Sequence, residues 1–258
     1  MKHMARLKFA LIYAGRHIQL SALVAIASLA FVFFLLYPAP YHTMLGVGSV
    51  FFLLLAVDVV CGPLLTLILA NPKKSRRERW MDFSLIGVVQ IMALAYGLHS
   101  LWLGRPSILA FEYDRLLIVT ANEIEQETVA DNKIGLRHLP WYGVVSVALD
   151  RPKTADEVFR SVDLGLSGIS PAMLPPWWLP WDSAKPAMNQ RAKPVAELLA
   201  RRPQDAATLQ AAIQETGLPP EQLRYLPLTS SRTKEWVALL DGELNMVGWA
   251  PVDGFAAP

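Results

Sequence analysis

The chain has 258 residues, of which 53% are hydrophobic and only 18% charged, a low charged fraction for a soluble protein. Residues 1–104 carry nine Lys and Arg against three Asp and Glu, whereas residues 105–258 carry fifteen against nineteen. The acidic balance of the second half argues against nucleic-acid binding. The composition predicts that the first half lies in a lipid bilayer.

The first apolar run, Leu20–Tyr37, follows a basic N-terminal segment. It is longer than the apolar core of a signal peptide and lacks a small-residue cleavage site, so we expect an uncleaved transmembrane helix with a cytoplasmic N-terminus. Pro38 and Pro40 end this helix. The following turn has no Lys or Arg, as expected of a periplasmic turn.

Two further apolar runs cover about residues 44–70 and 83–103. A basic loop separates them, and a short loop of this kind stays in the cytoplasm. Its basic residues are Lys73, Lys74, Arg76, Arg77 and Arg79. The sequence therefore predicts a multi-pass inner-membrane protein, with three transmembrane α-helices in residues 1–104 and a periplasmic α+β domain in residues 105–258.

Asp58 lies inside the second apolar run, where a charge costs roughly 2.5 to 3.5 kcal/mol. Counting residues from the expected cytoplasmic ends places Ser28 and Tyr96 at its depth and Gln90 nearer the cytoplasm, beside Thr66. Ser28 and Tyr96 are therefore candidate hydrogen-bond partners of Asp58.

Helical spacing places Asp58 on one face with Cys61, Gly62, Leu65 and Thr66. Three interpretations follow: a structural bond within the bundle, a docking face for another membrane helix, or a proton relay. The docking face would include Asp58, Gly62 and Pro63. A single carboxylate in three helices makes the relay the weakest of the three.

The pattern changes to strands after Gly104, with strands expected at residues 108–113, 116–120 and 144–149. Helices are expected from Thr154, with Glu157 completing a capping box, to Leu164, and over residues 195–202 and 206–216. A hairpin is expected at residues 236–249.

The segment between these helices, residues 170–186, is rich in proline and contains Trp177, Trp178 and Trp181. Its prolines argue against regular structure. The tryptophans either fold onto the domain's own sheet or form a rim that binds a partner or the membrane surface.

Few residues suggest catalysis. Cys61 is the only cysteine and His138 the only histidine after residue 104, which argues against disulfides, Cys-based metal clusters and histidine-dependent triads. No nucleophile elbow, P-loop or dinucleotide fingerprint occurs. Glu123, Glu125 and Glu127 indicate a solvated edge if this stretch is a strand. We expect no catalytic residues, no metal and no cofactor.

Four motifs follow one another along the chain: VDVVCGPLLTL at residues 57–67, NPKKSRRE at 71–78, ALAYGL at 93–98 and RPSILAFEYDRLLIVTANEI at 105–124. Together they resemble the type IV pilin accessory family of the TfpX/TfpZ type. The resemblance is dense over residues 30–125. It implies an inner-membrane protein that assists the stability or assembly of a pilin, and it brings no catalytic residues.

The resemblance suggests the type IV major pilin as partner, because pilins also insert with one N-terminal helix and carry a periplasmic head. We expect a chaperone-like, non-enzymatic factor that contacts the pilin helix through the Asp58 face and the pilin head through the Trp-rich segment. The alternatives are a membrane enzyme that modifies pilin, for example by glycan transfer, and a membrane sensor. The oligomeric state is left open.

Overall fold

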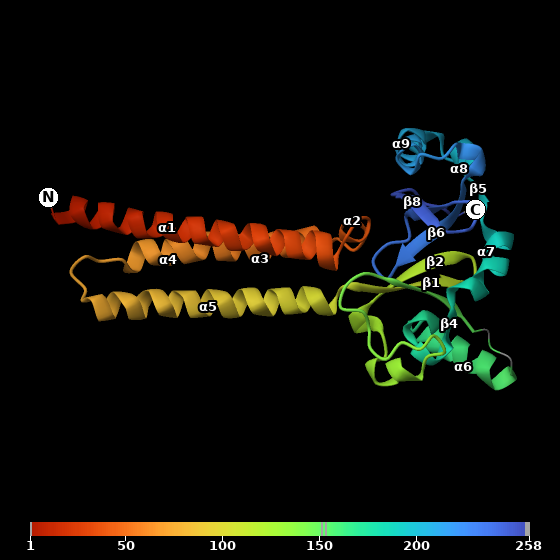
Figure 1. Ribbon diagram of the computed structural model, residues 1–258, viewed down its shortest axis with the longest axis horizontal. Coiled ribbons are helices and arrows are strands. Elements are labelled where there is room, and N and C mark those ends of the chain that lie inside the picture. Colours follow the sequence, from red (N-terminus) through yellow and green to blue (C-terminus); the bar gives the residue numbers. More distant parts are fainter. Residues whose placement is uncertain (1, 151, 153, 256–258) are drawn as a thin grey trace. The chain divides into compact units, whose positions relative to one another are not determined.

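The computed structural model describes residues 2–150, 152 and 154–255. The chain forms two compact units, Met1–Leu103 and Gly104–Pro258. The first is helical, and the second combines helices with a mixed sheet (Figure 1).

Among the described residues, the helical unit contains three runs long and apolar enough to cross a membrane, Arg6–Leu36, Val47–Leu69 and Arg76–Leu103. Its elements are α1 (Lys2–Ala30), a π-helical segment (Phe31–Leu36), α2 (Tyr41–Met44), α3 (Val47–Ala56), a second π-helical segment (Val57–Cys61), α4 (Gly62–Leu69) and α5 (Arg76–Leu103). The expected three long apolar helices are confirmed, and their length and composition support membrane association.

The helices extend further than the apolar runs. The N-terminus of α5 explains why: Ser75 and Glu78 form a reciprocal capping box, in which Ser75 N donates to Glu78 Oε2 over 2.7 Å and Glu78 N donates to Ser75 Oγ over 3.2 Å. The charged turn before Phe83 is therefore helical.

Contacts along the bundle set the level of each helix. The Tyr13 and Phe83 rings stack 5.3 Å apart, and Tyr37 Oη donates to Leu101 O over 2.8 Å. Helix α1 packs along α4, and α4 packs along α5, as Figure 1 also shows.

The second unit is built on one mixed sheet in the order β4-β3-β1-β2-β6-β7-β8, with β5 paired to β6. The strands are β1 (Pro106–Glu112), β2 (Arg115–Thr120), β3 (Val145–Leu149), β4 (Trp178–Pro180), β5 (Lys193–Pro194), β6 (Arg224–Ser230), β7 (Trp236–Leu240) and β8 (Met246–Ala250). Parallel pairing joins β1 to β3 and β2 to β6, and the other pairs are antiparallel.

The α-helices that accompany the sheet in the described residues are α6 (Ala155–Leu166), α7 (Lys185–Arg191), α8 (Val195–Arg201) and α9 (Ala206–Thr216). One hydrophobic cluster packs α8 and α9 against β7 and includes Leu198, Leu209 and Leu239. A second cluster lies around β1 and β3 and includes Ile108, Val147 and Trp178. Each half of the sheet thus has its own core.

Most strands and helices expected in this unit are confirmed. The helix that begins beside Thr154 is present, but the Glu157 side chain lies outside the described residues. Strand β6 was not anticipated. It contains Pro227, and its parallel pairing with β2 begins at Leu228, so the missing proline N–H is not required by that ladder.

The expectation that residues 170–186 lack regular structure is wrong in part. β4 and the start of α7 lie there, joined by 3₁₀ turns. The physical reason is that a proline is tolerated in an edge strand and in the first turn of a helix. The Glu123–Glu127 stretch is also not a strand, because it forms 3₁₀ turns. Thr120 is the N-cap residue of the first turn, and its backbone N–H donates to Glu123 Oε2 over 2.8 Å.

Trp178 is fully buried, and its Nε1 donates to Ala172 O over 2.9 Å. We expect Trp178→Ala to lower the free energy of unfolding of the second unit by about 3–5 kcal/mol, because it leaves a cavity and an unpaired carbonyl. Pulse proteolysis of the full-length protein in urea measures this. Trp141→Ala is the control, since Trp141 is 75% exposed. Equal midpoints for the two variants would contradict the packing of Trp178.

Candidate functional site

A proline shapes the helix at Asp58. Residues Val57–Cys61 are π-helical, and Pro63 follows in the first turn of α4. In π-helical register the Asp58 carbonyl would accept from the backbone N–H of residue 63, but proline has none. The Asp58 carbonyl therefore needs a donor from elsewhere in the bundle.

Gln90 on α5 supplies that donor. Its Nε2 donates to Asp58 O over 2.8 Å and to the carboxylate Oδ1 over 3.0 Å. A carbonyl only accepts, so the two contacts fix the amide orientation and turn Gln90 Oε1 toward α1. One side chain thus satisfies the backbone and the side chain of Asp58.

His17 on α1 completes the network. Its Nε2 lies 2.8 Å from Gln90 Oε1, and its Nδ1 lies 2.6 Å from Thr66 Oγ1. Because Gln90 Oε1 only accepts, Nε2 carries the proton, and in a neutral imidazole Nδ1 accepts from the Thr66 hydroxyl. Asp58, Gln90, His17 and Thr66, the polar network of the bundle, link three helical runs.

The expected partners of Asp58 are therefore wrong. Tyr96 is 76% exposed, and Ser28, although buried, makes none of the bonds that the structure gives Asp58. The depth count failed because the helices continue through their charged ends. Arg79 lies over the Phe9 ring, and counting from Arg79 places Gln90 at a depth of about 16 Å. Counting from Ala70 places Asp58 at a depth of roughly 18 Å, so the two residues lie at nearly the same level.

The docking candidates Gly62 and Pro63 are buried inside the bundle. A Cβ on Gly62 would lie 2.1 Å from Gln90 Nε2, so this glycine makes room for the Gln90 amide. Thr66 lies on the same buried face, whereas Cys61 and Leu65 are exposed. The face is thus narrower than expected and is occupied by the bundle's own side chains.

A groove remains open beside Asp58, with a volume of about 300 Å³. Its lining includes the polar side chains of His17, Asp58 and Gln90, and the other lining residues come from α1 and α5. The wall residues are Leu20, Ser21, Val24, Gly87, Ile91 and Leu94. Asp58 is 9% exposed and is one of the residues that line this groove.

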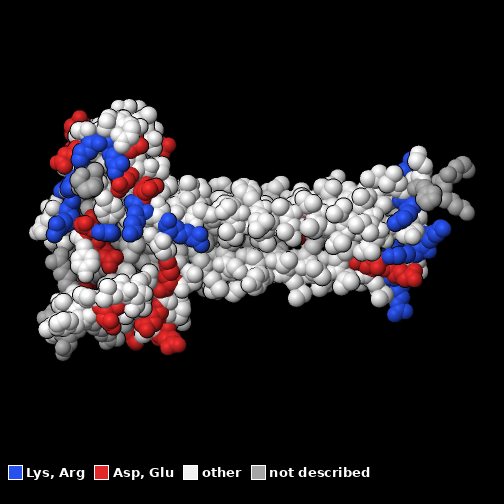
Figure 2. Space-filling view, turned by 180° about the vertical axis from the view of Figure 1, so that it is seen from behind, with Lys and Arg blue, Asp and Glu red and all other residues white. Residues whose placement is uncertain are grey.

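The basic loop lies at one end of the bundle. Lys74 pairs with Asp82 over 2.6 Å, Arg79 donates to Lys74 O over 2.6 Å, and Arg6 of α1 donates to Ile68 O over 3.3 Å. Figure 2 shows Lys and Arg gathered at this end of the helices, while the helix surface beyond it is almost free of charge. Lys73, Arg76 and Arg77 belong to the same loop and first turn.

The three tryptophans of residues 170–186 have different surroundings. Trp178 is part of the core, as the interpretation of a segment folded onto its own sheet requires. Trp177 and Trp181 are half-buried. Tyr113, which lines the same pocket as Trp177, is 66% exposed.

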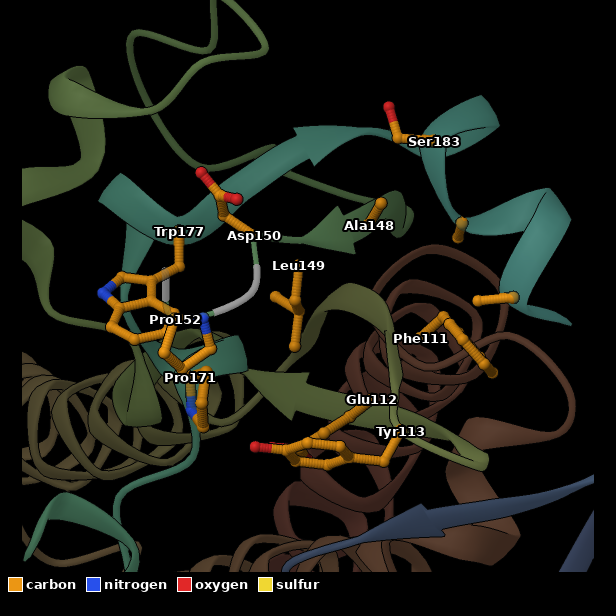
Figure 3. A pocket seen from close by; sticks show the side chains of 12 residues that line it. Phe111, Glu112, Tyr113, Ala148, Leu149, Asp150, Pro152, Pro171, Trp177 and Ser183 are labelled. Carbon is orange, nitrogen blue, oxygen red and sulfur yellow. The ribbon is translucent and has the colours of Figure 1, made fainter. Parts of the chain in front are cut away.

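A small pocket of about 80 Å³ borders Trp177 (Figure 3). Glu112, Asp150 and Ser183 are polar residues of its lining. The Ser170 hydroxyl donates to Glu112 Oε1 over 2.9 Å, and Asp150 pairs with Lys133 over 2.6 Å. Burial raises the pKa of Glu112 above its usual range, against the opposing effects of Ser170 and Arg115.

Helix α6 carries an apolar surface that the sequence reasoning missed. Val158, Phe159, Val162 and Leu166 are all exposed, Leu166 by 84%. They recur at i, i+1, i+4 and i+8, a periodicity that could have identified one apolar helix face. Such a face is typical of a site that contacts another molecule.

The chemistry available to these sites is limited. Among the described residues, no group of three or more His, Cys, Asp and Glu side chains is placed to hold a metal ion. The polar network offers hydrogen bonds in apolar surroundings, an arrangement suited to holding helices together.

Comparison with known proteins gives matches along the whole chain. A family model described as fimbrial assembly protein FimB matches residues 5–46. Two fimbrial assembly proteins of Dichelobacter nodosus, of serogroups E1 and I, are each 35% identical over 254 residues, covering 97% of this chain and 98% of the relative. A third, of serogroups C1 and C2, is 42% identical over 119 residues, covering 46% of this chain and 91% of the relative. No solved structure matches the chain.

Replacing Gln90 tests the polar network. We expect Gln90→Leu to destabilise the bundle by roughly 1–3 kcal/mol, because it leaves the Asp58 carbonyl and the His17 N–H without partners. The measurement is the SDS fraction at which the helices unfold in mixed micelles. Ser100→Ala is the matched control on α5, since its hydroxyl donates only within its own helix, to Tyr96 O. Equal midpoints for both variants would contradict the network.

Replacing Glu112 tests the second unit. Because folding raises the pKa of Glu112, stability is complete below the unfolded pKa of about 4.3 and falls as pH rises through the folded pKa. We therefore expect Glu112→Gln, which still accepts from Ser170, to raise the urea midpoint at pH 7 and to leave it unchanged at pH 4. Pulse proteolysis at both pH values checks this, and a variant less stable at pH 7 would contradict it.

Proposed function

This chain belongs to the family of fimbrial assembly proteins, and we propose that it is a membrane-embedded assembly factor that holds a type IV pilin before the subunit enters the fimbria. The observation that carries the proposal is the similarity along almost the full length of both chains. A partial match could reflect one shared domain. A match across both units supports a shared role for the whole protein.

The proposed topology has three crossings of the bacterial inner membrane. Arg6 and the loop around Lys74 and Arg79 meet at one end of the bundle, which supports a cytoplasmic position for that end. The turn between Tyr37 and Tyr41 has no Lys or Arg. In this proposed topology residues 105–258 lie in the periplasm, on the same side as the pilin head.

The proposed mode of action is non-covalent. The helices contact the subunit's transmembrane helix, while the second unit contacts its head through α6 and the half-buried Trp177 and Trp181. Trp178 is left out of this contact, because its burial gives it a core role. A membrane enzyme that modifies pilin is the second candidate, and the mass of the intact subunit distinguishes it from an assembly factor.

Deletion of the gene tests the proposal. We expect at least tenfold fewer fimbriae per cell, restored by the wild-type gene, because subunits are no longer held for assembly. Electron microscopy counts the fimbriae, and mass spectrometry of the intact subunit is expected to give the same mass in both strains.

The same strains separate the alternatives. Normal fimbriation of the deletion strain would contradict an assembly role. A change in subunit mass that the wild-type gene reverses would favour the enzyme, and a change in subunit transcript would favour the sensor. Co-purification of the subunit with the tagged full-length protein tests the complex directly.

A further inference from the structure

Within the bundle, the described side chains donate a hydrogen bond to one of the two carboxylate oxygens of Asp58. Gln90 Nε2 donates to Oδ1 and to the Asp58 carbonyl, so both amide hydrogens are occupied. Among the described residues, no other side chain donates to this carboxylate. Its second oxygen, Oδ2, therefore lacks a donor within the part of the chain that the structure describes.

The groove gives Asp58 its access to a partner. Asp58 is more than nine-tenths buried and is one of the residues that line the groove. Besides Asp58, the polar lining residues are His17, Ser21 and Gln90, and the other lining residues are apolar. A carboxylate oxygen in such surroundings is costly unless a donor reaches it. The groove is therefore complementary to an apolar surface that carries one donor.

The groove walls are also suited to a helix. Ser21 and Gly87 are small residues on α1 and α5, and a Cβ on Gly87 would meet nothing within 4 Å. Small residues allow two membrane helices to approach closely. A lipid acyl chain could fill the same space but could not donate a hydrogen bond to Asp58.

We infer that this groove seats one transmembrane helix of the fimbrial subunit, and that this helix donates a hydrogen bond to Asp58 Oδ2 from a hydroxyl, amide or ammonium group. The inference rests on the proposed function and names its contact site. Asp58 thus serves two partners: Oδ1 holds α5 through Gln90, and Oδ2 receives the subunit.

Two variants change the groove while preserving the bundle. Asp58→Asn keeps an acceptor for Gln90 but replaces the second carboxylate oxygen by an uncharged NH₂ group, which cannot accept from the subunit. Gly87→Leu fills the groove from its wall without meeting the bundle's own atoms. The matched control is Gly15→Leu, because Gly15 is a glycine of α1 with equally open surroundings that does not line the groove.

The experiment is photocrosslinking in native membranes of the fimbriated strain, with benzoylphenylalanine at Ile91 or Leu20. Both residues line the groove and are more than 60% exposed. The reference position is Leu53 on α3, which is 68% exposed and lies outside the groove lining. We expect a subunit adduct from Ile91 and Leu20 but not from Leu53.

In the same assay we expect Asp58→Asn and Gly87→Leu to reduce the adduct about tenfold, and Gly15→Leu to change it less than twofold. All variants are compared at equal membrane levels and with SDS midpoints matching the wild type. The subunit's co-purification with the wild-type protein is measured in parallel.

Three results would overturn the inference. An adduct unchanged by both groove variants, or adducts with lipid alone while the subunit still co-purifies, would place the subunit elsewhere and leave the proposed function intact. If the subunit neither forms an adduct nor co-purifies with the wild-type protein, the inference and the proposed function would be overturned together.

Discussion

The helical unit depends on the hydrogen bonds from the Gln90 amide to Asp58. Pro63 removes a backbone donor at the π-helical turn, which leaves the Asp58 carbonyl exposed to apolar surroundings. Gln90 replaces that donor and binds the carboxylate with the same nitrogen. Gly62 is required beside it, because a side chain there would occupy the position of the amide. The roles of Asp58, Gly62 and Pro63 are thus all explained by the binding of the Gln90 amide at this turn.

The direction of these bonds determines what remains available to a partner. Gln90 can only accept through Oε1, so His17 must donate to it through Nε2, and His17 Nδ1 is left to bond the Thr66 hydroxyl. Within the part of the chain that the structure describes, no side chain donates to Asp58 Oδ2, and Asp58 lines the groove. Under our proposal, the protein binds a fimbrial subunit that is itself a membrane protein. A groove lined by small residues and carrying one hydrogen-bond acceptor is suited to binding a transmembrane helix of that subunit.

Prolines also shape the local structure of the second unit. In residues 170–186, prolines occur in an edge strand and in the first turn of α7, where no backbone N–H is needed. This lets the segment bury Trp178 while Trp177 stays half-exposed beside the pocket. The exposed apolar face of α6 lies only a few residues after Pro152, which lines that pocket. The surfaces proposed to meet the subunit head therefore come from one continuous part of the chain.

The sequence by itself determined the three long apolar helices, the family and most strands, because hydrophobic periodicity and turn residues are local signals. It also identified Asp58 as the residue that needs a partner. Only the tertiary structure decided that the partner is Gln90 and that His17 joins it, because the level of each helix depends on where its neighbours end. Apolar composition marks the lipid-facing span, but the helices continue through capped, charged ends such as Ser75–Glu78. The burial of Trp178 and the opening at Asp58 likewise follow from packing between distant segments, which no local pattern encodes.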